Sequence, residues 1–436
     1  MIKIILHQIW NQKQLNAWIF IELVIAGFLI WTVIDPICMI TADKSIPKGY
    51  NSENLFVLNF GQYDDSYSQY DASQDSSEIQ LQQFRSIVST LKNCPEVKNV
   101  AITAFSSFPN SSSWSGTVIM NEDSVNVHVQ NYAVSSEEGY KICETLGMID
   151  ANTNKELILP EDFFKKNMIA ISENTAMLLY GTTDVVSKKI IDYDYNKEIG
   201  AVFKNIKNFD YEQPYRTIIS SEPLKGGSYM TWNYNIIFRL KDNITPNVFI
   251  ERFEKEVVPH INTGNFFYRN IKSFDEFSHE KAVESGILNK LRLKYSLAGF
   301  AVLCIFIGMI GTFWIRCNAR REDIGIMRSI GASKKTIIKQ FLLEASLLAT
   351  MAFIISLLFT VNYVYTEGFA DTTISIPFLK EKYIPDPNLW QNNPYVKFIV
   401  ISAITYILIL ITAVTGTYIP VRNTLKKLPV EALREE

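Results

Sequence analysis

The chain has 436 residues, of which 47% are hydrophobic and 20% are charged, and its formal net charge is −3. Such a length leaves room for about two to three domains. The charged fraction excludes a chain that is apolar throughout, so the apolar residues must be concentrated in blocks. The net charge itself says little, because positive and negative side chains are segregated along the chain.

Residues 1–16 place their apolar side chains on one face of a helix, which is typical of a helix that lies in the membrane interface. The apolar run that follows, residues 17–34, fits either a signal peptide or a retained transmembrane helix. A long amphipathic segment precedes it, and Ile40 stands where a signal peptidase needs a small residue. Both features favour the retained helix.

Four apolar runs are each close to the ~20 residues that a helix needs to cross the hydrocarbon core of a bilayer. They are residues 17–34, 295–315, 341–365 and 398–419. Glu22 lies in the first run and Glu344 in the third, and a carboxylate at this depth is expensive and therefore a candidate functional group. For Glu22 the alternative is a side chain that reaches the membrane surface or pairs with a neighbouring helix. For Glu344 we expect a local ion pair with a basic residue at the inner interface.

Residues 41–292 alternate strand patterns with helix patterns, which predicts an α/β or α+β domain between the first two apolar runs. The predicted strands are residues 54–60, 97–104, 125–133, 168–172, 189–193, 199–206, 216–220 and 236–240. The predicted helices are residues 78–93, 137–146, 161–166, 173–179 and 247–260. Residues 274–294 are expected to form a stalk helix that continues into the second apolar run, since only Gly286 interrupts the pattern. Whether Cys94 and Cys143 pair within this domain stays open.

Residues 316–339 carry seven basic and two acidic side chains between the second and third apolar runs. Short loops rich in Lys and Arg are retained in the cytoplasm, so this loop is predicted to be cytoplasmic. Ile324, Met327 and Ile330 recur at near-helical spacing and predict an amphipathic helix at the membrane surface. Gly331 can end that helix in a left-handed conformation, and Ser333 can cap the next one.

The order of residues in this loop resembles the signature of the MacB/FtsX family of ABC transporter permeases. Residues 320–348 read RREDIGIMRSIGASKKTIIKQFLLEASLL, with the family's Arg-rich turn, Glu/Asp-Ile-Gly-Ile-hydrophobic-Arg core, Gly-Ala-Ser/Thr turn and Leu-Leu-Glu in that order. The tail is similar to the family's ending at Pro420, at Arg422 and in the Pro-Val-Glu-Ala-Leu-Arg of residues 429–434. More loosely, residues 172–181 resemble a strand-to-helix connection in the periplasmic core domain of MacB-like proteins.

The resemblance implies that this loop couples the membrane helices to an ATPase. The residues that match the coupling motif are Arg320, Arg321, Glu322, Ile324, Gly325, Met327, Arg328, Ile330 and Gly331. The sequence contains no Gly-x-x-x-x-Gly-Lys-Ser/Thr phosphate-binding loop, so ATP and Mg²⁺ are expected on a separate ATPase subunit, as in stand-alone permeases such as FtsX. No catalytic residue, bound cofactor or metal site is expected in this chain.

The expected function is that of an ABC transporter permease which couples ATP hydrolysis to movement of its extracytoplasmic domain, a mechanism called mechanotransmission. The resemblance implies export or extraction of peptides, lipoproteins or amphiphilic drugs. An FtsX-like regulator of an extracytoplasmic cell-wall hydrolase and a membrane sensor are the alternatives. Expected partners are the ATPase, a second permease copy or a paralogue, membrane lipid, and a periplasmic adaptor or substrate, with no nucleic acid.

The predicted fold class is a multi-pass α-helical membrane protein with four transmembrane helices and a large α/β (α+β) extracytoplasmic domain between the first and second. The expected location is the bacterial inner membrane, with both termini in the cytoplasm. The expected segments are an interfacial helix (1–16), the first transmembrane helix (17–40), the extracytoplasmic domain with its stalk helix (41–292), the second transmembrane helix (293–316), the cytoplasmic coupling loop (317–336), the third transmembrane helix (337–365), an extracytoplasmic loop (366–394), the fourth transmembrane helix (395–419) and a cytoplasmic tail (420–436).

Overall fold

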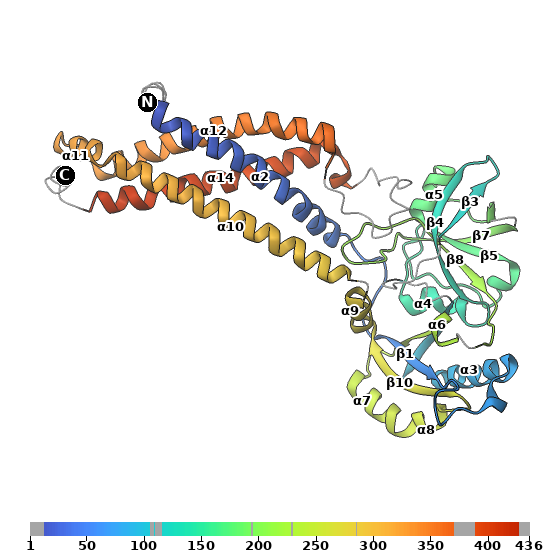
Figure 1. Cartoon of the computed structure of the whole chain (residues 1–436). Coiled ribbons are helices and arrows are strands. Elements are labelled where there is room, and N and C mark those ends of the chain that lie inside the picture. The colour runs from blue at the N-terminus through green and yellow to red at the C-terminus, as the bar shows by residue number, and fades with distance from the viewer. Residues whose placement is uncertain are drawn as a thin grey trace. The chain divides into compact units, whose positions relative to one another are not determined.

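A computed structural model describes residues 13–104, 109, 116–192, 195–227, 230–284, 286–369 and 389–426. It divides into two compact units, which we treat separately (Figure 1). The helical unit contains the described residues of 13–42, 290–369 and 389–426. The sheet domain contains those of 43–289.

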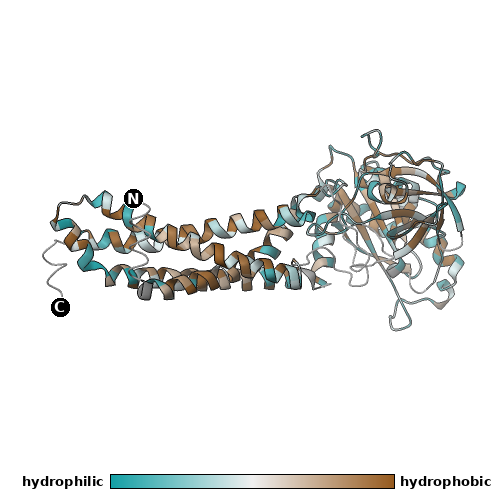
Figure 2. Cartoon of the chain, turned by 90° about the horizontal axis from the view of Figure 1, so that it is seen from above, coloured by the Kyte–Doolittle hydropathy of each residue, from teal (hydrophilic) through white to brown (hydrophobic). Residues whose placement is uncertain are grey.

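Four long helices in the described chain are apolar enough to cross a membrane. They are α2 (Lys13–Ser45), α10 (Ile287–Ala319), α12 (Lys334–Glu367) and α14 (Pro394–Thr424). Figure 2 shows hydrophobic residues dominating all four. The four predicted transmembrane helices and the predicted fold class are therefore confirmed, and the chain is a membrane protein.

Small residues let these helices approach one another closely. A Cβ added to Gly27 of α2 would meet the Oγ of Ser356 on α12 at 2.7 Å, and one added to Gly416 of α14 would meet Phe313 of α10 at 3.2 Å. Lipid tails are as apolar as the side chains, so the hydrophobic effect does not drive membrane helices together. They associate through close van der Waals packing, which small residues permit. α10 is the least buried of the four helices. In its most apolar stretch 17% of the residues are buried, compared with 33–44% in the other three helices.

An ion pair joins α2 to α14 in the interior of the helical unit. The Nζ of Lys397 lies 3.4 Å from Asp35, and both side chains are buried. Nearby, the Nε1 of Trp31 donates to the Oγ of Ser402 at 3.2 Å. This pair was not predicted, because Asp35 and Lys397 each lie one residue outside an apolar run.

The sheet domain contains a ten-stranded sheet in the order β10-β1-β9-β2-β4-β3-β6-β7-β5-β8. Because β4 also pairs with β8, the last six strands close into a ring. The strands are β1 (Leu55–Gln62), β2 (Val97–Ala104), β3 (Gly116–Asn121), β4 (Asn126–Ser135), β5 (Met168–Ser172), β6 (Lys189–Asp192), β7 (Tyr195–Phe203), β8 (Thr217–Glu222), β9 (Tyr234–Leu240) and β10 (Phe266–Ser273).

Both faces of the four-stranded part, β10-β1-β9-β2, are buried. Phe56 and Leu58 of β1 point to one face, where they pack with side chains of α3 (Ser77–Lys92), α7 (Pro246–Arg252) and α8 (Val258–Ile261). Leu55 and Val57 point to the other face, towards α4 (Ile142–Leu146) and α9 (Phe274–Glu284). Alternation with period two therefore places apolar residues on both sides of the strand, as in a fully covered sheet.

Most predicted elements of this domain are present. All eight predicted strands have a counterpart, whereas β3 and β10 were not predicted. The helix predicted at residues 247–260 is interrupted by a π-helical segment, Phe253–Val257. The helices predicted at 137–146 and 161–166 are less regular than expected. The first consists of a 3-10 turn at Gly139–Lys141 followed by Ile142–Leu146, and the second is a 3-10 turn at Phe164–Lys166. α5 (Glu173–Tyr180) follows β5 as predicted and ends at Gly181 in a left-handed conformation.

The prediction of one continuous stalk helix over residues 274–294 is wrong. α9 ends at Glu284 and α10 begins at Ile287. Between them Gly286 has φ +69°, a left-handed conformation that a residue without Cβ adopts readily and that ends a helix. Phe274 and Phe277 of α9 are buried in the core of the sheet domain, so this helix is part of the domain.

Three predicted segments lie wholly or partly outside the described residues. They are the interfacial helix at 1–16, the loop at 366–394 and the tail at 420–436. Within the last of these, residues 420–424 belong to α14, so the fourth helix extends beyond the predicted end at residue 419.

The cysteines of the sheet domain are unpaired. Cys94 and Cys143 are free thiols that lie in two different apolar cores of the domain. Burial raises the pKa of each thiol. A raised pKa leaves little thiolate, so both side chains serve as small apolar core residues.

A buried lysine binds the last turn of α2 within the sheet domain. The Nζ of Lys207 donates to the carbonyl oxygens of Asp43 at 2.8 Å, Ile46 at 3.1 Å and Asp210 at 2.6 Å. Burial lowers the pKa of this ammonium group. The three carbonyls satisfy all three donors of the ammonium group, which also lies favourably at the negative end of a helix.

Replacing Lys207 with Met is expected to lower the free energy of unfolding by about 3 kcal/mol, because it leaves buried carbonyl groups without a donor. The midpoint of thermal unfolding of the full chain in detergent measures this effect. Lys155→Met, at an exposed lysine of the same domain, is the matched control and should leave the midpoint unchanged. Equal midpoints for both variants would contradict the assignment.

Candidate functional site

The basic loop folds into one short helix and a sharp turn. α11 (Arg321–Ser329) has Glu322 and Asp323 in its first turn and Arg328 in its last, which suits the dipole of a helix. It ends in a Schellman motif: the amide of Gly331 donates to the carbonyl of Arg328 at 3.1 Å, and the amide of Ala332 to that of Met327 at 3.0 Å.

The turn uses the two residues that the sequence indicated. Gly331 has φ +95°, and the Oγ of Ser333 accepts a hydrogen bond from the amide of Thr336 in the first turn of α12. The predicted helix, its end and the cap of the next helix are confirmed. α11 and α12 are therefore held at a defined angle by local backbone chemistry.

A buried cluster of charges ties α11 to the long helices. Glu344 of α12 accepts a hydrogen bond from Arg316 of α10 at 2.5 Å and another from Arg320, at the start of α11, at 2.6 Å. All three side chains are almost completely buried. Arg320 also bonds Asp323 at 3.2 Å, and its guanidinium group lies 4.6 Å from the ring centre of Phe341. The ion pair expected for Glu344 is confirmed, and it has two partners.

The apolar side of α11 faces the protein's own helices. Ile324 packs in a buried cluster with Cys317 of α10, Ile337 and Phe341 of α12, and Val421 of α14. Met327 packs against the edge of this cluster. Such burial, about 1.5–3 kcal/mol for a large aliphatic side chain, stabilises the helix on the bundle.

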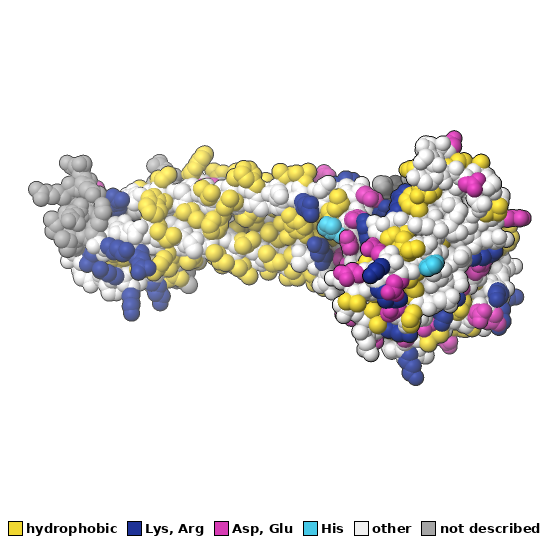
Figure 3. Space-filling view, turned by 90° about the horizontal axis from the view of Figure 1, so that it is seen from below, with side chains coloured by type: hydrophobic (Ala, Val, Ile, Leu, Met, Phe, Trp, Pro, Cys, Tyr) yellow, Lys and Arg dark blue, Asp and Glu magenta, His cyan; other side chains and the backbone are white. Residues whose placement is uncertain are grey.

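The opposite side of α11 is exposed. Glu322, Ile326, Ser329 and Ile330 recur at spacings of three and four residues, so they lie on one helical face. Ile326 is 48% exposed and Ile330 is 81% exposed. Figure 3 shows Lys and Arg side chains gathered at this end of the helical unit, next to an apolar belt along the helices.

The predicted coupling residues thus separate into three groups. Buried residues that hold the helix in place are Arg320, Ile324 and Gly325; residues at its boundary are Arg321, Met327 and Arg328; exposed residues are Glu322, Ile330 and Gly331. Ile324 does not offer an apolar contact to a partner, because it is only 1% exposed. Ile326 was not predicted as a coupling residue. Its position four residues before Ile330 puts it on the same helical face and could have indicated it.

Arg328 adds a further link. Its Nη1 donates to the carbonyl of Leu425, just beyond the end of α14, at 3.2 Å. Together with Glu344 and the cluster around Ile324, this bond fixes α11 to three long helices. We call α11 together with these contacts the α11 bracket. It is held rigidly on one side and has one exposed face.

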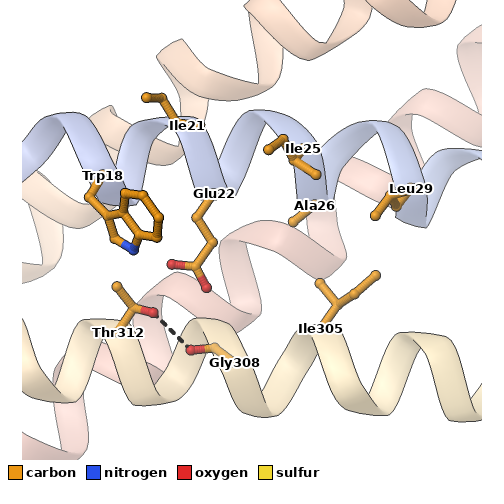
Figure 4. A pocket seen from close by; sticks show the side chains of 9 residues that line it. All are labelled: Trp18, Ile21, Glu22, Ile25, Ala26, Leu29, Ile305, Gly308 and Thr312. Atoms are coloured by element: carbon orange, nitrogen blue, oxygen red, sulfur yellow. Dashed lines mark hydrogen bonds between the residues drawn. The ribbon is translucent and has the colours of Figure 1, made fainter.

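The second acidic residue, Glu22, is not part of this bracket. It lies on α2 and lines a groove of about 410 Å³ that α2 forms with α10 (Figure 4). No ion pair involves Glu22 among the described residues. Glu22 and Glu344 therefore occupy different sites.

Comparison with known proteins identifies the part of the chain that contains the bracket. Residues 295–429 match the model of the family described as FtsX-like permease C-terminal. This part of the chain is therefore similar to an FtsX-like permease domain. The match includes α11, most of the three long helices that hold it, and the residues of the buried charge cluster.

Two relatives are similar over a larger part of the chain. The probable syringafactin export ATP-binding/permease protein SyfD of Pseudomonas syringae is 25% identical over 281 residues, which is 62% of this chain and 38% of SyfD. The macrolide export ATP-binding/permease protein MacB of Neisseria gonorrhoeae is 25% identical over 215 residues, 47% of this chain and 30% of MacB. The resemblance to MacB/FtsX-type permeases is confirmed, and the chain spans about a third of the length of these relatives.

Solved structures with partial similarity include a periplasmic region and an extracellular domain. The periplasmic region of MacB from Actinobacillus actinomycetemcomitans gives a TM-score of 0.33 with 11% identity, over 53% of this chain and 94% of that one. The extracellular domain of the transporter YknZ from Gram-positive bacteria gives a TM-score of 0.29 with 12% identity, over 50% and 100% of the two chains.

Replacing Glu344 with Gln is expected to destabilise the helical unit strongly. It removes the negative partner of the buried guanidinium group of Arg316 and leaves Arg320 with only Asp323 at 3.2 Å. Breaking a buried pair in this way costs about 3–5 kcal/mol. The measurement is the fraction of detergent-solubilised protein that stays monodisperse after heating. Glu322→Gln, an acidic residue on the exposed face of the same site, is the control and should behave like wild type. Equal heat resistance of Glu344→Gln and wild type would refute the role of the cluster.

Proposed function

We propose that this chain is the permease subunit of an ABC-type export system and that the exposed face of α11 is the docking surface for its ATPase. The single observation that carries this proposal is the two-sided character of α11. One side is fixed to the bundle, and the other presents Ile326 and Ile330 to solvent. An exposed apolar pair on a rigid helix, rimmed by charge, has the composition of a protein-binding surface.

ATP and Mg²⁺ would be bound by the partner. The relatives SyfD and MacB are named ATP-binding/permease proteins, which supports an ATPase as the partner of the permease part. In this proposal the chain performs no chemistry itself. It converts closure of the ATPase into movement of its helices, and a second copy of the permease or a paralogue completes the transporter.

Movement of α11 would pass directly to the bundle. Arg316, Arg320 and Glu344 join α11 to α10 and α12, and Arg328 joins it to the end of α14. A charge cluster buried in a low dielectric cannot separate without a large cost, so the helices should move together with α11. This rigidity is what the proposed mechanotransmission requires.

The connection to the sheet domain is proposed to run through α2 as well as α10. α2 is one helix from Lys13 to Ser45, and Lys207 of the sheet domain binds its last turn. Gly286, by contrast, separates α10 from α9. We therefore propose that α2 has the main role in transmitting movement to the sheet domain.

The proposed orientation is based on charge. Short loops rich in Lys and Arg are retained in the cytoplasm, so we propose that the basic segment around α11 faces the cytoplasm at a bacterial inner membrane and that the sheet domain faces the outer side. Peptides, lipoproteins or amphiphilic compounds are the proposed substrates. They would be handled at the outer face, where a periplasmic adaptor could also bind.

The docking surface predicts that Ile330→Asp abolishes co-purification of an ATPase from membranes in mild detergent while the permease stays as stable as wild type. A charge at a fully desolvated contact position typically costs several kcal/mol of binding free energy. Ile158→Asp is the matched control, since Ile158 is 63% exposed in the sheet domain, and it should retain the ATPase. If no nucleotide-binding protein accompanies even the wild-type chain, the proposed function fails.

A further inference from the structure

The groove between α2 and α10 lies within the helical unit and is separate from the α11 bracket. Its walls come from a stripe along α2 with helical spacing and from the facing turns of α10. The lining residues are Trp18, Ile21, Glu22, Ile25, Ala26 and Leu29 of α2 and Ile305, Gly308 and Thr312 of α10. Its volume of about 410 Å³ is in the range of small-molecule sites.

Among the described residues, Glu22 is the only charged one that lines this groove. Its side chain points from α2 towards Gly308 of α10 (Figure 4). The Oε2 atom is buried and accepts no hydrogen bond from the described part of the chain. Thr312 does not donate to it, because its Oγ1 donates to the carbonyl of Gly308 at 3.0 Å. A carboxylate in such a setting is costly unless a cation or a donor joins it.

Gly308 provides the space in front of the carboxylate. A Cβ added to Gly308 would lie 3.7 Å from the Oε1 of Glu22, which is ordinary van der Waals contact. A small methyl group is therefore tolerated there, whereas a larger side chain would fill the groove. The sequence thus leaves a gap opposite the one charged group.

Trp18 adds a second feature that favours a cation. Its indole ring stands beside the carboxylate of Glu22 in Figure 4, and the side chain is 72% exposed. Indole is the best aromatic partner of an ammonium group, which it attracts through the negative face of its ring. On the other side of Glu22 the lining residues Ile25, Leu29 and Ile305 are apolar. One end of the groove is therefore suited to a positive charge and the other to hydrocarbon.

We propose that this groove binds a cationic amphiphile, with its ammonium group between Glu22 and Trp18 and its apolar body along Ile25, Leu29 and Ile305. Charge complementarity favours this occupant over anionic lipids and neutral acyl chains. The carboxylate would repel the former, and the latter would leave it without a partner. The ammonium group of a zwitterionic phospholipid has a suitable charge, but it lies in the headgroup layer of the bilayer. Glu22 also lies six residues inside the span that begins at Asn16, about 9 Å along the helix axis, which is deeper than a lipid headgroup.

The identification of this amphiphile as a transported substrate rests on the proposed function. Binding itself does not, because it needs neither an ATPase nor ATP. A binding experiment on the permease alone therefore separates the two ideas. If the amphiphile binds but no ATPase associates, the proposed binding site is supported and the proposed transport function is refuted. If an ATPase associates but the amphiphile does not bind, the transport function is supported and the binding site is refuted.

The test uses bromine quenching of tryptophan fluorescence with the full chain in phosphatidylcholine nanodiscs. The probes are 12-bromododecylammonium and, as the neutral counterpart, 12-bromododecanol, both expressed as mole fraction in the bilayer. The difference between wild type and Trp18→Phe isolates the emission of Trp18. We expect half-quenching of Trp18 at an about fivefold lower mole fraction of the cationic probe, as a desolvated cation–π and charge contact would give.

Two variants and a control decide the result. Glu22→Gln, which keeps the shape of the side chain, and Gly308→Leu, which fills the groove, should each remove the preference for the cationic probe. Glu367→Gln removes an exposed acidic residue at the end of α12 and should keep it. Equal quenching by both probes in wild type, or a preference that survives Glu22→Gln, overturns the proposal. So does a groove closed to both probes because two copies of the chain are packed on it.

Discussion

The buried carboxylate of Glu344 is the constraint on which the arrangement of the helical unit depends. It is bound by guanidinium groups from two directions, Arg316 on α10 and Arg320 at the start of α11. In a low-dielectric interior these charges stabilise one another only while their geometry is kept. The position of α11 is therefore set by charge, and the apolar packing of Ile324 completes the attachment.

This attachment explains why α11 can be both short and rigid. A nine-residue helix is unstable by itself, because nucleation costs more than so few hydrogen bonds return. Here the Schellman turn at Gly331, the ion pairs of Arg320 and the bond of Arg328 to Leu425 hold it from both ends. The exposed face then has no role in holding the helix, and a partner is the proposed contact of its two isoleucines.

Much of this architecture could be predicted from the sequence, because hydropathy and charge act locally. The four helices, the basic loop, the turn at Gly331 and the ion pair of Glu344 all follow from such signals. Periodicity locates an apolar stripe but not the direction in which it faces, so Ile324 was assigned to a partner although it packs inside. Tertiary pairs such as Asp35 with Lys397 join residues distant in sequence, and no local pattern connects them. The break at Gly286 results from the left-handed conformation of this one residue. The residues on both sides have a helical pattern, so the sequence did not indicate the break.

The central claim is that the exposed face of α11, and not its buried face, contacts an ATPase. The most direct measurement is photo-crosslinking in native membranes from a benzophenone amino acid placed at position 330, with position 324 as the inward-facing comparison. The account predicts an adduct with a nucleotide-binding protein from position 330 and only intramolecular products from position 324. An adduct from position 324, or none from position 330 in cells that contain the ATPase, would contradict it.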